Sequence, residues 1–258
     1  MDRRHSVNQT IRMRTEAEQA ERLAFFTLKK VNKALRQFGM IQDGDRVAVA
    51  VSGGKDSLGL LCLLKDNLRT SLEKYSLVAI HVHGDARGPD KTPRTPALED
   101  WLKAEGVEYR IEDIRLASGQ ELPMSCQRCA WSRRRTLFEV AAELGCNKLA
   151  YAHHADDLIQ TYLMNLLYHG RSEGLAPVRQ FFGGRFTLIR PLILVPEKEM
   201  VRLAKARGFS PPPPLCPMAD VSRRETVRKI IALAETRGRQ VRANLLRLAL
   251  AATQRSGI

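Results

Sequence analysis

The sequence contains no apolar run that approaches the roughly 20 residues needed to span a bilayer, and no apolar segment typical of a secretory leader. Cysteine is scarce: the chain has five, an odd number that does not suit a framework of paired disulfides. These absences argue against a membrane protein and against a secreted disulfide scaffold. We therefore expect a cytoplasmic protein, with no membrane partner, whose thiols are reduced or bound to metal.

Acidic side chains are the minority among the charged residues. The 28 Asp and Glu residues stand against 42 Lys and Arg, which gives a net charge of +14. The excess lies at the two ends, because residues 1–40 hold 9 basic against 4 acidic residues and residues 222–258 hold 9 against 2. Phosphate backbones attract such charge, so the ends indicate a polyanionic partner, most simply RNA. A solvated basic surface is the alternative that charge alone leaves open.

Residues 46–64 are the most informative stretch, in which two apolar runs flank a glycine-rich turn. The first run, residues 47–51, is short and rich in β-branched side chains, as in a buried parallel strand, and the second can open a helix. Paired glycines let the backbone approach a ligand closely, and a helix N-terminus attracts anions. The turn therefore predicts a phosphate-binding loop made of Ser52, Gly53, Gly54, Lys55, Asp56 and Ser57.

This turn lacks the spacing of a Walker A loop, in which four residues separate the first glycine from Gly-Lys-Ser/Thr. Here Gly53 and Gly54 are adjacent, and Asp56 separates Lys55 from Ser57. The hexapeptide SGGKDS instead resembles the pyrophosphate (PP) loop of the N-type ATP pyrophosphatases. That resemblance implies cleavage of ATP between its α and β phosphates and adenylation of a substrate. An ordinary turn with a helix cap at Ser57 is the alternative, but it leaves the pair Lys55 and Asp56 unexplained.

Short apolar strands alternate with helices along the middle of the chain. Such alternation predicts βαβ units with right-handed crossovers, and hence an α/β fold with a mainly parallel, Rossmann-like sheet. The strands are expected at residues 47–51, 77–82, 108–114 and 148–152, followed by a hairpin at 179–190.

The chain divides into a core and two basic ends. We expect an N-terminal helical extension over residues 1–42, a PP-loop domain with the cysteine site over 43–221, and basic helices over 222–258. In the N-terminal extension, apolar residues recur near the helical period and predict a packed face. These residues are Leu23, Phe25, Phe26, Leu28, Val31 and Leu35.

Polar side chains follow two of the predicted strands at their carboxyl ends. His83 ends the second strand, and the segment HHADD at residues 153–157 follows the fourth. Ligands of open α/β sheets bind outside the carboxyl strand ends, which places His83 near an adenosine, although a histidine in such a place is more often structural. Asp156 and Asp157 can hold Mg²⁺ through water and orient a triphosphate, and one of them can also cap the next helix.

Three of the five cysteines form a candidate metal site. Cys126 and Cys129 have the spacing that lets two thiolates reach one metal, and Cys216 follows a stiff run of prolines. Structural zinc and Fe–S clusters normally take four protein ligands. Three thiolates therefore need a fourth group such as His153 or His154, or they leave one iron open to a ligand such as hydrosulfide. A CxxC redox pair and chance are the alternatives.

The chain resembles the tRNA 2-thiocytidine synthetase family (TtcA-like) in four segments that occur in the same order. They are SGGKDS at 52–57, CQRC at 126–129, AHHADD at 152–157, and Cys216 followed by proline. The resemblance runs from about residue 26 to about residue 231. It implies a PP-loop ATPase fold, a [4Fe-4S] cluster on three cysteines, and ATP-dependent thiolation of a cytidine in the tRNA anticodon loop to 2-thiocytidine.

The resemblance also implies a ligand set and a basic catalytic residue. Cys126, Cys129 and Cys216 would hold the cluster. Arg133 falls four residues after Cys129, where the wider family carries a basic residue between the cluster and the nucleotide. We expect Arg133 to neutralise the leaving phosphate.

The ATP site follows from the same resemblance. Residues 52–57 would bind the phosphates, with Lys55 stabilising their charge and Asp56 near Mg²⁺. Asp157 matches the acidic residue that closes the second ATP motif, and Ala152 stands where glycine is more usual. Attack of the cytidine C2 oxygen on the α phosphate would give an adenylate and pyrophosphate, and sulfur would then displace AMP.

The resemblance implies tRNA and ATP as partners, a sulfur donor such as a cysteine desulfurase, and a homodimer. A PP-loop sulfurtransferase acting on a tRNA uridine or on a small molecule is the nearest alternative. A tRNA lysidine synthetase shares a related loop but needs no cluster, and the three cysteines argue against it. A non-enzymatic RNA-binding protein would not need the intact pair Lys55 and Asp56.

Overall fold

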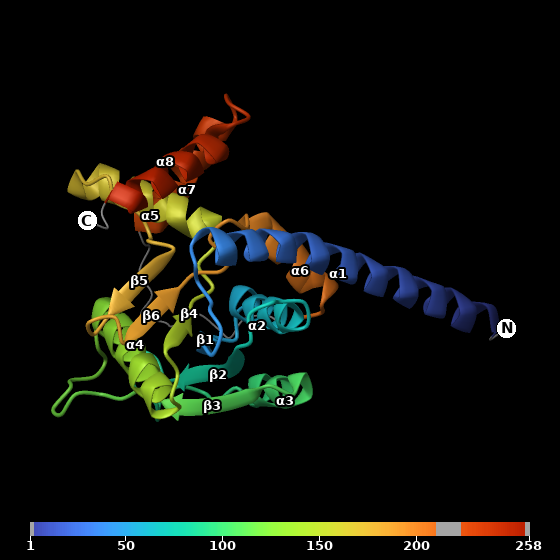
Figure 1. Ribbon diagram of the computed structural model, residues 1–258, viewed down its shortest axis with the longest axis horizontal. Coiled ribbons are helices and arrows are strands. Elements are labelled where there is room, and N and C mark those ends of the chain that lie inside the picture. Colours follow the sequence, from blue (N-terminus) through green and yellow to red (C-terminus); the bar gives the residue numbers. More distant parts are fainter. Residues whose placement is uncertain (1–2, 210–222, 256–258) are drawn as a thin grey trace.

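The computed structural model describes residues 3–209 and 223–255, and Cys216 lies outside this part of the chain. A six-stranded sheet carries helices on both faces (Figure 1). The strands are β1 (Arg46–Ala50), β2 (Ser76–His83), β3 (Glu108–Asp113), β4 (Lys148–Ala150), β5 (Val178–Phe181) and β6 (Phe186–Ile189). The helices are α1 (Arg3–Gln37), α2 (Lys55–Leu68), α3 (Pro96–Glu105), α4 (Cys126–Glu143), α5 (Ala155–His169), α6 (Glu197–Ala206), α7 (Arg223–Glu235) and α8 (Val241–Arg255).

The strand order is β3-β2-β1-β4-β6-β5, and every neighbouring pair is parallel except the hairpin of β5 and β6. Because β1 lies at the centre and the chain leaves it in both directions, the carboxyl ends of β1 and β4 meet at the point where the strand order reverses. Open α/β sheets bind their ligands at this point. The predicted parallel α/β fold is confirmed, and the predicted hairpin extends the same sheet.

The alternation of side chains along the strands divides the core into two layers. Val47 and Val49 of β1 pack on one face of the sheet with Leu77 of β2, whereas Ala48 and Val78 pack on the other face. Residues on both faces are apolar because helices cover both sides. Such strands read as continuous apolar runs, which is why they could be located in the sequence.

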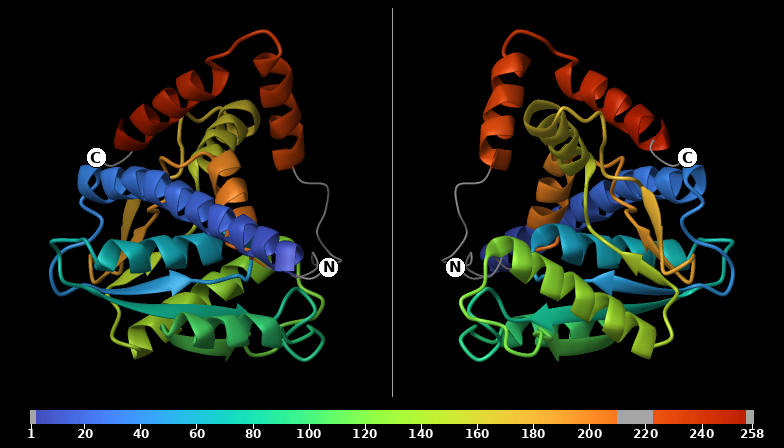
Figure 2. Two further views of the ribbon diagram at one scale, coloured as in Figure 1. Left: turned by 90° about the vertical axis from the view of Figure 1, so that its right-hand side faces the viewer. Right: turned by 90° about the vertical axis from the view of Figure 1, so that its left-hand side faces the viewer.

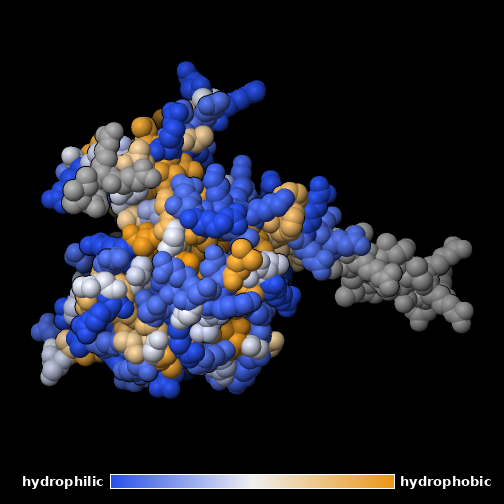
Figure 3. All heavy atoms as spheres, in the orientation of Figure 1, coloured by the Kyte–Doolittle hydropathy of each residue, from blue (hydrophilic) through white to orange (hydrophobic). Residues whose placement is uncertain are grey.

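The helices cover the two faces unequally (Figures 1 and 2). Helices α1, α2, α3 and α6 contribute to the larger core cluster, whereas α4 packs on the opposite face against β2 and β4. Helices α5, α7 and α8 form a layer above the sheet, in which Ile159 of α5 packs with Val227 and Ile231 of α7, and Leu245 and Leu246 of α8 pack against them. In the view of Figure 3, most of the surface is hydrophilic, and apolar residues gather where this helical layer meets the body below.

The packed face of α1 differs from the predicted one. Val31 and Leu35 are buried as expected, but Phe25 and Phe26 are exposed. The buried side of α1 instead contains Ala24 and Val31, which are seven residues, or two helical turns, apart. Phe25 and Phe26 are consecutive and therefore point 100° apart, so they cannot both face the same narrow core. Both phenylalanines therefore remain on the surface, where Lys29 lies over the Phe25 ring at 4.4 Å.

The larger core cluster includes residues from both basic ends of the chain. Ala24 of α1 and Ala249 of α8 belong to the same buried cluster as the sheet residues. The limits predicted for the three regions stay a prediction. Within the described residues, no helix combines the length and the apolar character needed to cross a membrane.

Candidate functional site

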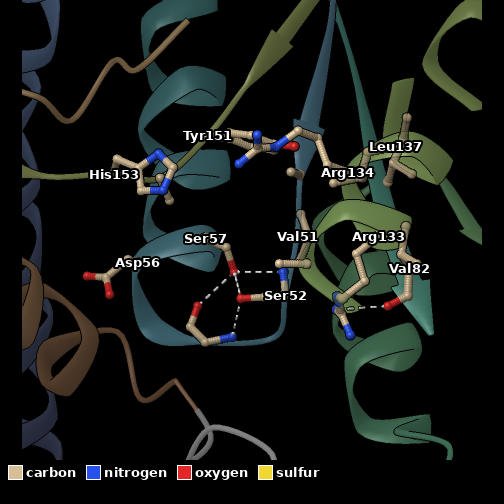
Figure 4. A pocket seen from close by; sticks show the side chains of 15 residues that line it. Val51, Ser52, Asp56, Ser57, Val82, Arg133, Arg134, Leu137, Tyr151 and His153 are labelled. Carbon is tan, nitrogen blue, oxygen red and sulfur yellow. Dashed lines mark hydrogen bonds between the residues drawn. The ribbon is translucent and has the colours of Figure 1, made fainter. Parts of the chain in front are cut away.

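The turn between β1 and α2 is held by its two serines (Figure 4). The Ser57 hydroxyl donates to the Gly54 carbonyl oxygen at 2.9 Å and accepts from the Ser52 backbone N–H at 3.1 Å. The Ser52 hydroxyl accepts from the Gly54 N–H at 3.3 Å. Gly53 has a φ of +83°, in the left-handed region that disfavours any side chain. The loop is therefore preformed, and it presents the positive end of α2.

A cavity of about 430 Å³ opens at the carboxyl ends of β1 and β4 (Figure 4). Its wall consists of the turn, the first residues of α2, one side of α4 and the segment after β4. This volume falls in the range of about 300–1,000 Å³ that small-molecule sites occupy. Six residues of the sequence-predicted site line it, namely Ser52, Gly54, Asp56, Ser57, Arg133 and Ala152.

Asp56 has one carboxylate oxygen in an ion pair and one without a protein partner. Its Oδ2 accepts from Lys55 Nζ at 2.7 Å, whereas Oδ1 is buried and has no hydrogen-bond partner among the described residues. A buried carboxylate oxygen without a partner is costly unless a ligand satisfies it. Because Asp56 lines the cavity, the donor set fits a hydrated Mg²⁺ that carries phosphates.

Lys55 lies beside the cavity between two carboxylates. Its Nζ is 2.7 Å from Asp56 Oδ2 and 3.4 Å from Glu197 Oε1 at the start of α6. Burial lowers the pKa of Lys55, but the hydrogen bond and charge of Asp56, followed by Glu197, more than offset this and raise it above the ordinary value. Lys55 is therefore cationic at any physiological pH and can turn from Glu197 toward a bound phosphate.

Arg133 anchors α4 to the end of β2 and reaches the cavity. Its two terminal nitrogens donate to the carbonyl oxygens of Gly84 and Val82, the latter at 3.0 Å. These bonds use two of the five N–H donors of a guanidinium, so donors remain for an anion. The neighbouring Arg134 also lines the cavity, and the two guanidinium groups make this wall positive.

The opposite wall holds a half-buried, neutral histidine. His153 follows β4, and its Nδ1 accepts from Arg190 Nε at 3.2 Å. Burial, and then the positive charge of Arg190, lower the pKa of His153 to about 4. Burial also lowers the pKa of Arg190, to about 10, which leaves it charged at neutral pH. The Tyr151 ring contacts the His153 ring edge to face at 5.6 Å, so this wall offers an aromatic surface to a base.

The lowered pKa of His153 predicts a stability loss in acid. The pKa of His153 is about 4 in the folded protein and 6.5 in the unfolded chain. Between pH 4 and pH 6.5 the imidazole is therefore protonated mainly in the unfolded state, and a fall in pH favours unfolding. We expect this group to reduce the free energy of unfolding by about 1–2 kcal/mol when pH falls from 7 to 5. Urea unfolding at the two pH values, compared with His153→Gln, would measure it. An equal pH dependence in the variant would contradict the assignment.

The two aspartates after His154 bind the C-terminal helices, and Asp157 also takes part in the cap of α5. Asp157 Oδ2 accepts from the His154 backbone N–H at 3.0 Å, and His154 Nδ1 accepts from the Asp157 N–H at 3.3 Å. Asp157 Oδ1 also pairs with Arg224 of α7 at 3.3 Å, and Asp156 pairs with Arg242 of α8. The N-cap residue of α5 is therefore His154, not an aspartate, and Asp157 takes part in the cap as the third residue of a capping box; Asp157 is not among the residues that line the cavity.

Cys126 and Cys129 lie in the first turn of α4. Ser125 caps this turn by accepting the Arg128 N–H at 3.2 Å, and Cys126 is exposed while Cys129 is half-buried. At 3.6 residues per turn, Cys126, Cys129 and Arg133 share one side of α4. Two thiolates on this side fit part of a metal or cluster site. Among the side chains that the structure describes, in residues 18–209 and 223–253, no group of three from His, Cys, Asp or Glu gathers around one point.

Comparison with known proteins decides the family. Residues 27–210 match the family described as PP-loop domain. A tRNA-cytidine(32) 2-sulfurtransferase of Citrifermentans bemidjiense is 37% identical over 235 residues, which cover 88% of this chain and 90% of that protein. The chain belongs to this PP-loop family. The enzyme of the same name from Geobacter sulfurreducens is 36% identical and covers 84% of this chain and 86% of its own length.

A solved structure supports the same family. The U34-tRNA thiolase NcsA from Methanococcus maripaludis, determined with its [4Fe-4S] cluster, matches with a TM-score of 0.71 and 26% identity. The match covers 89% of this chain and 78% of that one. The resemblance to the 2-thiocytidine family predicted from the sequence is confirmed.

In this PP-loop protein, some of the remaining predicted site residues adjoin the cavity and one does not. Gly53 and Lys55 adjoin the cavity, and Cys126 and Cys129 stand on the helix that forms one wall. His83 lies elsewhere: its buried ring is 3.2 Å from the Pro89 carbonyl oxygen, in a second, smaller cavity beside β2 and α3. The roles predicted for these residues stay predictions.

Arg134, Leu137 and Tyr151 line the cavity but were not singled out in the sequence. Tyr151 and Arg134 each adjoin a residue that was, namely Ala152 and Arg133. Leu137 is one turn beyond Arg133 on α4, and the helical period could have found it.

Proposed function

We propose that this protein is an ATP-dependent tRNA sulfurtransferase, which activates the C2 oxygen of an anticodon-loop cytidine and replaces it with sulfur to give 2-thiocytidine, AMP and pyrophosphate. The observation that carries the proposal is that the PP-loop turn and the cysteine helix α4 form walls of the same cavity. A nucleotide bound by the turn is therefore next to any sulfur chemistry on α4. The protein's 37% identical relatives bear the name of this activity.

The chain's own residues supply the electrostatics of adenylation. The N-terminus of α2 and Lys55 would hold the β and γ phosphates of ATP, and Asp56, whose Oδ1 has no partner among the described residues, would hold Mg²⁺. Arg133 faces the α phosphate from the other wall with the donors not used by Gly84 and Val82. The charge that develops on pyrophosphate as the adenylate forms is then stabilised from both sides.

We further propose that Cys126, Cys129 and Cys216 hold a [4Fe-4S] cluster. The two described thiols occupy the exposed first turn of a helix whose other residues on the same side line the ATP cavity. When bound, a cluster with three protein ligands supplies an iron with an open position for sulfur. Arg133, one turn from Cys129, then lies between the cysteines and the nucleotide.

Cytidine is favoured over uridine as the acceptor. The cytidine-modifying relatives share 37% identity with the chain, whereas the U34-tRNA thiolase shares 26%. We also propose a cysteine desulfurase or comparable protein as the sulfur donor, a homodimeric enzyme, and a reaction that takes place in the cytoplasm. The basic charge of both ends supports tRNA as the acceptor rather than a small molecule.

Nucleoside mass spectrometry of bulk tRNA from cells with and without the gene tests the reaction. We expect 2-thiocytidine to be absent from the deletion strain and restored by the intact gene. Loss of a thiouridine with unchanged 2-thiocytidine would keep the chemistry and change the base. An unaltered tRNA profile would contradict the proposal, because it would show that no tRNA base depends on this protein for its sulfur.

A further inference from the structure

Trp131 stands on the surface of α4 between two arginines. The side chain is 48% exposed. The guanidinium carbon of Arg128 lies 4.7 Å from the centre of the indole ring, and that of Arg135 lies 5.8 Å from it. The two cations are one turn before and one turn after Trp131, so the three side chains form a continuous cation–π row. We call Arg128, Trp131 and Arg135 the tryptophan platform.

The tryptophan platform borders the cysteine and nucleotide site. Trp131 follows Cys129 by two residues and adjoins Ala130, which lines the ATP cavity. Arg134 lies between the platform and the cavity on the helix surface and also lines that cavity (Figure 4). In the right-hand view of Figure 2, α4 crosses the side of the sheet that faces the viewer. A polymer that enters the cavity along α4 would therefore pass over the platform.

Packing of the fold does not account for this tryptophan. The side of α4 that packs on the sheet consists of other residues, among them Thr136, Phe138 and Ala141. An indole with about half of its surface in water gives up about half of the stabilisation that full burial would supply. Charge indicates what covers it: from Cys126 to Phe138 the helix carries four arginines and no acidic residue, and although Arg135 pairs through its Nε with Glu139 at 2.6 Å, its terminal nitrogens keep donors for an anion. The platform thus combines an aromatic face with a surface complementary to phosphates.

We propose that Trp131 is a stacking site for an unpaired nucleobase of tRNA, with Arg128 and Arg135 contacting the adjoining phosphates. The inference deepens the proposed function, because the stacked base is a neighbour of the base that enters the cavity. Single-stranded loops are recognised by splaying bases onto aromatic and arginine faces, and phosphate contacts hold the strand in place. Trp131 is therefore a positioning residue for the acceptor strand.

Tryptophan fluorescence tests the stacking directly. The chain has 2 tryptophans, so a Trp101→Phe variant of the full-length, cluster-loaded protein leaves Trp131 as the emitter. We expect an anticodon stem-loop RNA to quench this emission and a fully paired RNA duplex of equal length to leave it nearly unchanged, because paired bases cannot stack on the indole. Equal quenching by both RNAs would overturn the proposal, since phosphate attraction alone would explain it.

Substitution separates stacking from general charge. We expect Trp131→Ala to raise the Kd and the KM for tRNA about 5- to 150-fold, the range for loss of one base–aromatic stack, with iron content and the KM for ATP unchanged. Trp131→Phe should restore most of the affinity. Phe182→Ala is the matched control, because Phe182 is an aromatic residue that is 60% exposed in the turn between β5 and β6, outside both basic ends and outside the cavity lining. An unchanged Kd in Trp131→Ala, or an equal loss in the control, would overturn the proposal.

The outcomes for the stacking site and for the proposed reaction can be told apart. If the protein forms no thiolated base but the stem-loop still quenches Trp131, the stacking site stands and the reaction is wrong. If thiolation proceeds and Trp131→Ala has the KM of the unsubstituted protein, the reaction stands and the stacking site is wrong.

Discussion

Cys126→Ala is expected to abolish formation of 2-thiocytidine and to lower bound iron and acid-labile sulfide to background. The physical reason is the ligand count: with three cysteines proposed, the loss of one leaves two thiolates, which are too few to retain a cluster against competing thiols. Anaerobic purification followed by iron and sulfide analysis measures the binding, and nucleoside mass spectrometry of tRNA measures the product. The fold should be unaffected because Cys126 is exposed.

The matched control for Cys126→Ala is Cys146→Ala. Cys146 is buried in the smaller core cluster, on the same face of the sheet as α4, and burial raises the pKa of its thiol, so it is a poor metal ligand. We expect this variant to keep its iron and its thiolation activity. Full thiolation by a Cys126→Ala protein that retains its cluster would contradict the assignment of Cys126 as a ligand.

Lys55→Ala is expected to slow AMP formation by about 10²- to 10³-fold in single turnovers with saturating ATP and tRNA. The substitution removes a cation preorganised beside the PP-loop turn, and the loss of one such oriented donor typically costs about 3–4 kcal/mol of transition-state stabilisation. It also leaves Asp56 without the ion pair at 2.7 Å, which should weaken ATP binding as well. Rapid quench with labelled ATP measures the rate.

Lys65→Ala provides the control on the same helix. Lys65 Nζ pairs with Glu105 Oε2 at 2.6 Å, and its side chain has a similar exposure to that of Lys55, but it lies three turns away from the phosphate loop. We expect a rate within about twofold of the unsubstituted protein, because an ion pair of this kind contributes little to chemistry elsewhere. If both lysine variants lost activity equally, general destabilisation rather than charge at the loop would be the cause.

The basic C-terminal end has a structural role in addition to the RNA binding proposed for it. Arg224 and Arg242 pair with Asp157 and Asp156, the carboxylates that the sequence suggested for Mg²⁺. In the sequence, these arginines are more than 60 residues from their partners, so only the packing of α7 and α8 on α5 could bring them together. Part of the positive charge that indicated RNA thus holds α7 and α8 to the first turn of α5.

The prediction for His83 shows the same dependence on packing. Its place at the carboxyl end of β2 was apparent from the sequence, and ligands commonly bind at such ends. Alternation along the strand then decides which face a side chain occupies, and the His83 ring turns toward Pro89 and α3 instead of the PP-loop cavity. The neighbouring His81 instead supports the loop, since its Nδ1–H donates to the Val51 carbonyl oxygen at 2.8 Å.

The sequence by itself determined the parallel sheet, the phosphate-binding turn at residues 52–57 and the cysteine spacing at 126–129, because each depends on residues close together in the chain. Only the tertiary structure decided that Arg133 and Arg134 face the same cavity as Ser52, that Trp131 remains exposed beside it, and that Phe25 lies on the surface. These are contacts between elements far apart in sequence. Each of these facts depends on which side of a helix packs against the sheet. That side is decided by contacts with strands that are distant in the sequence, so local sequence patterns do not specify it.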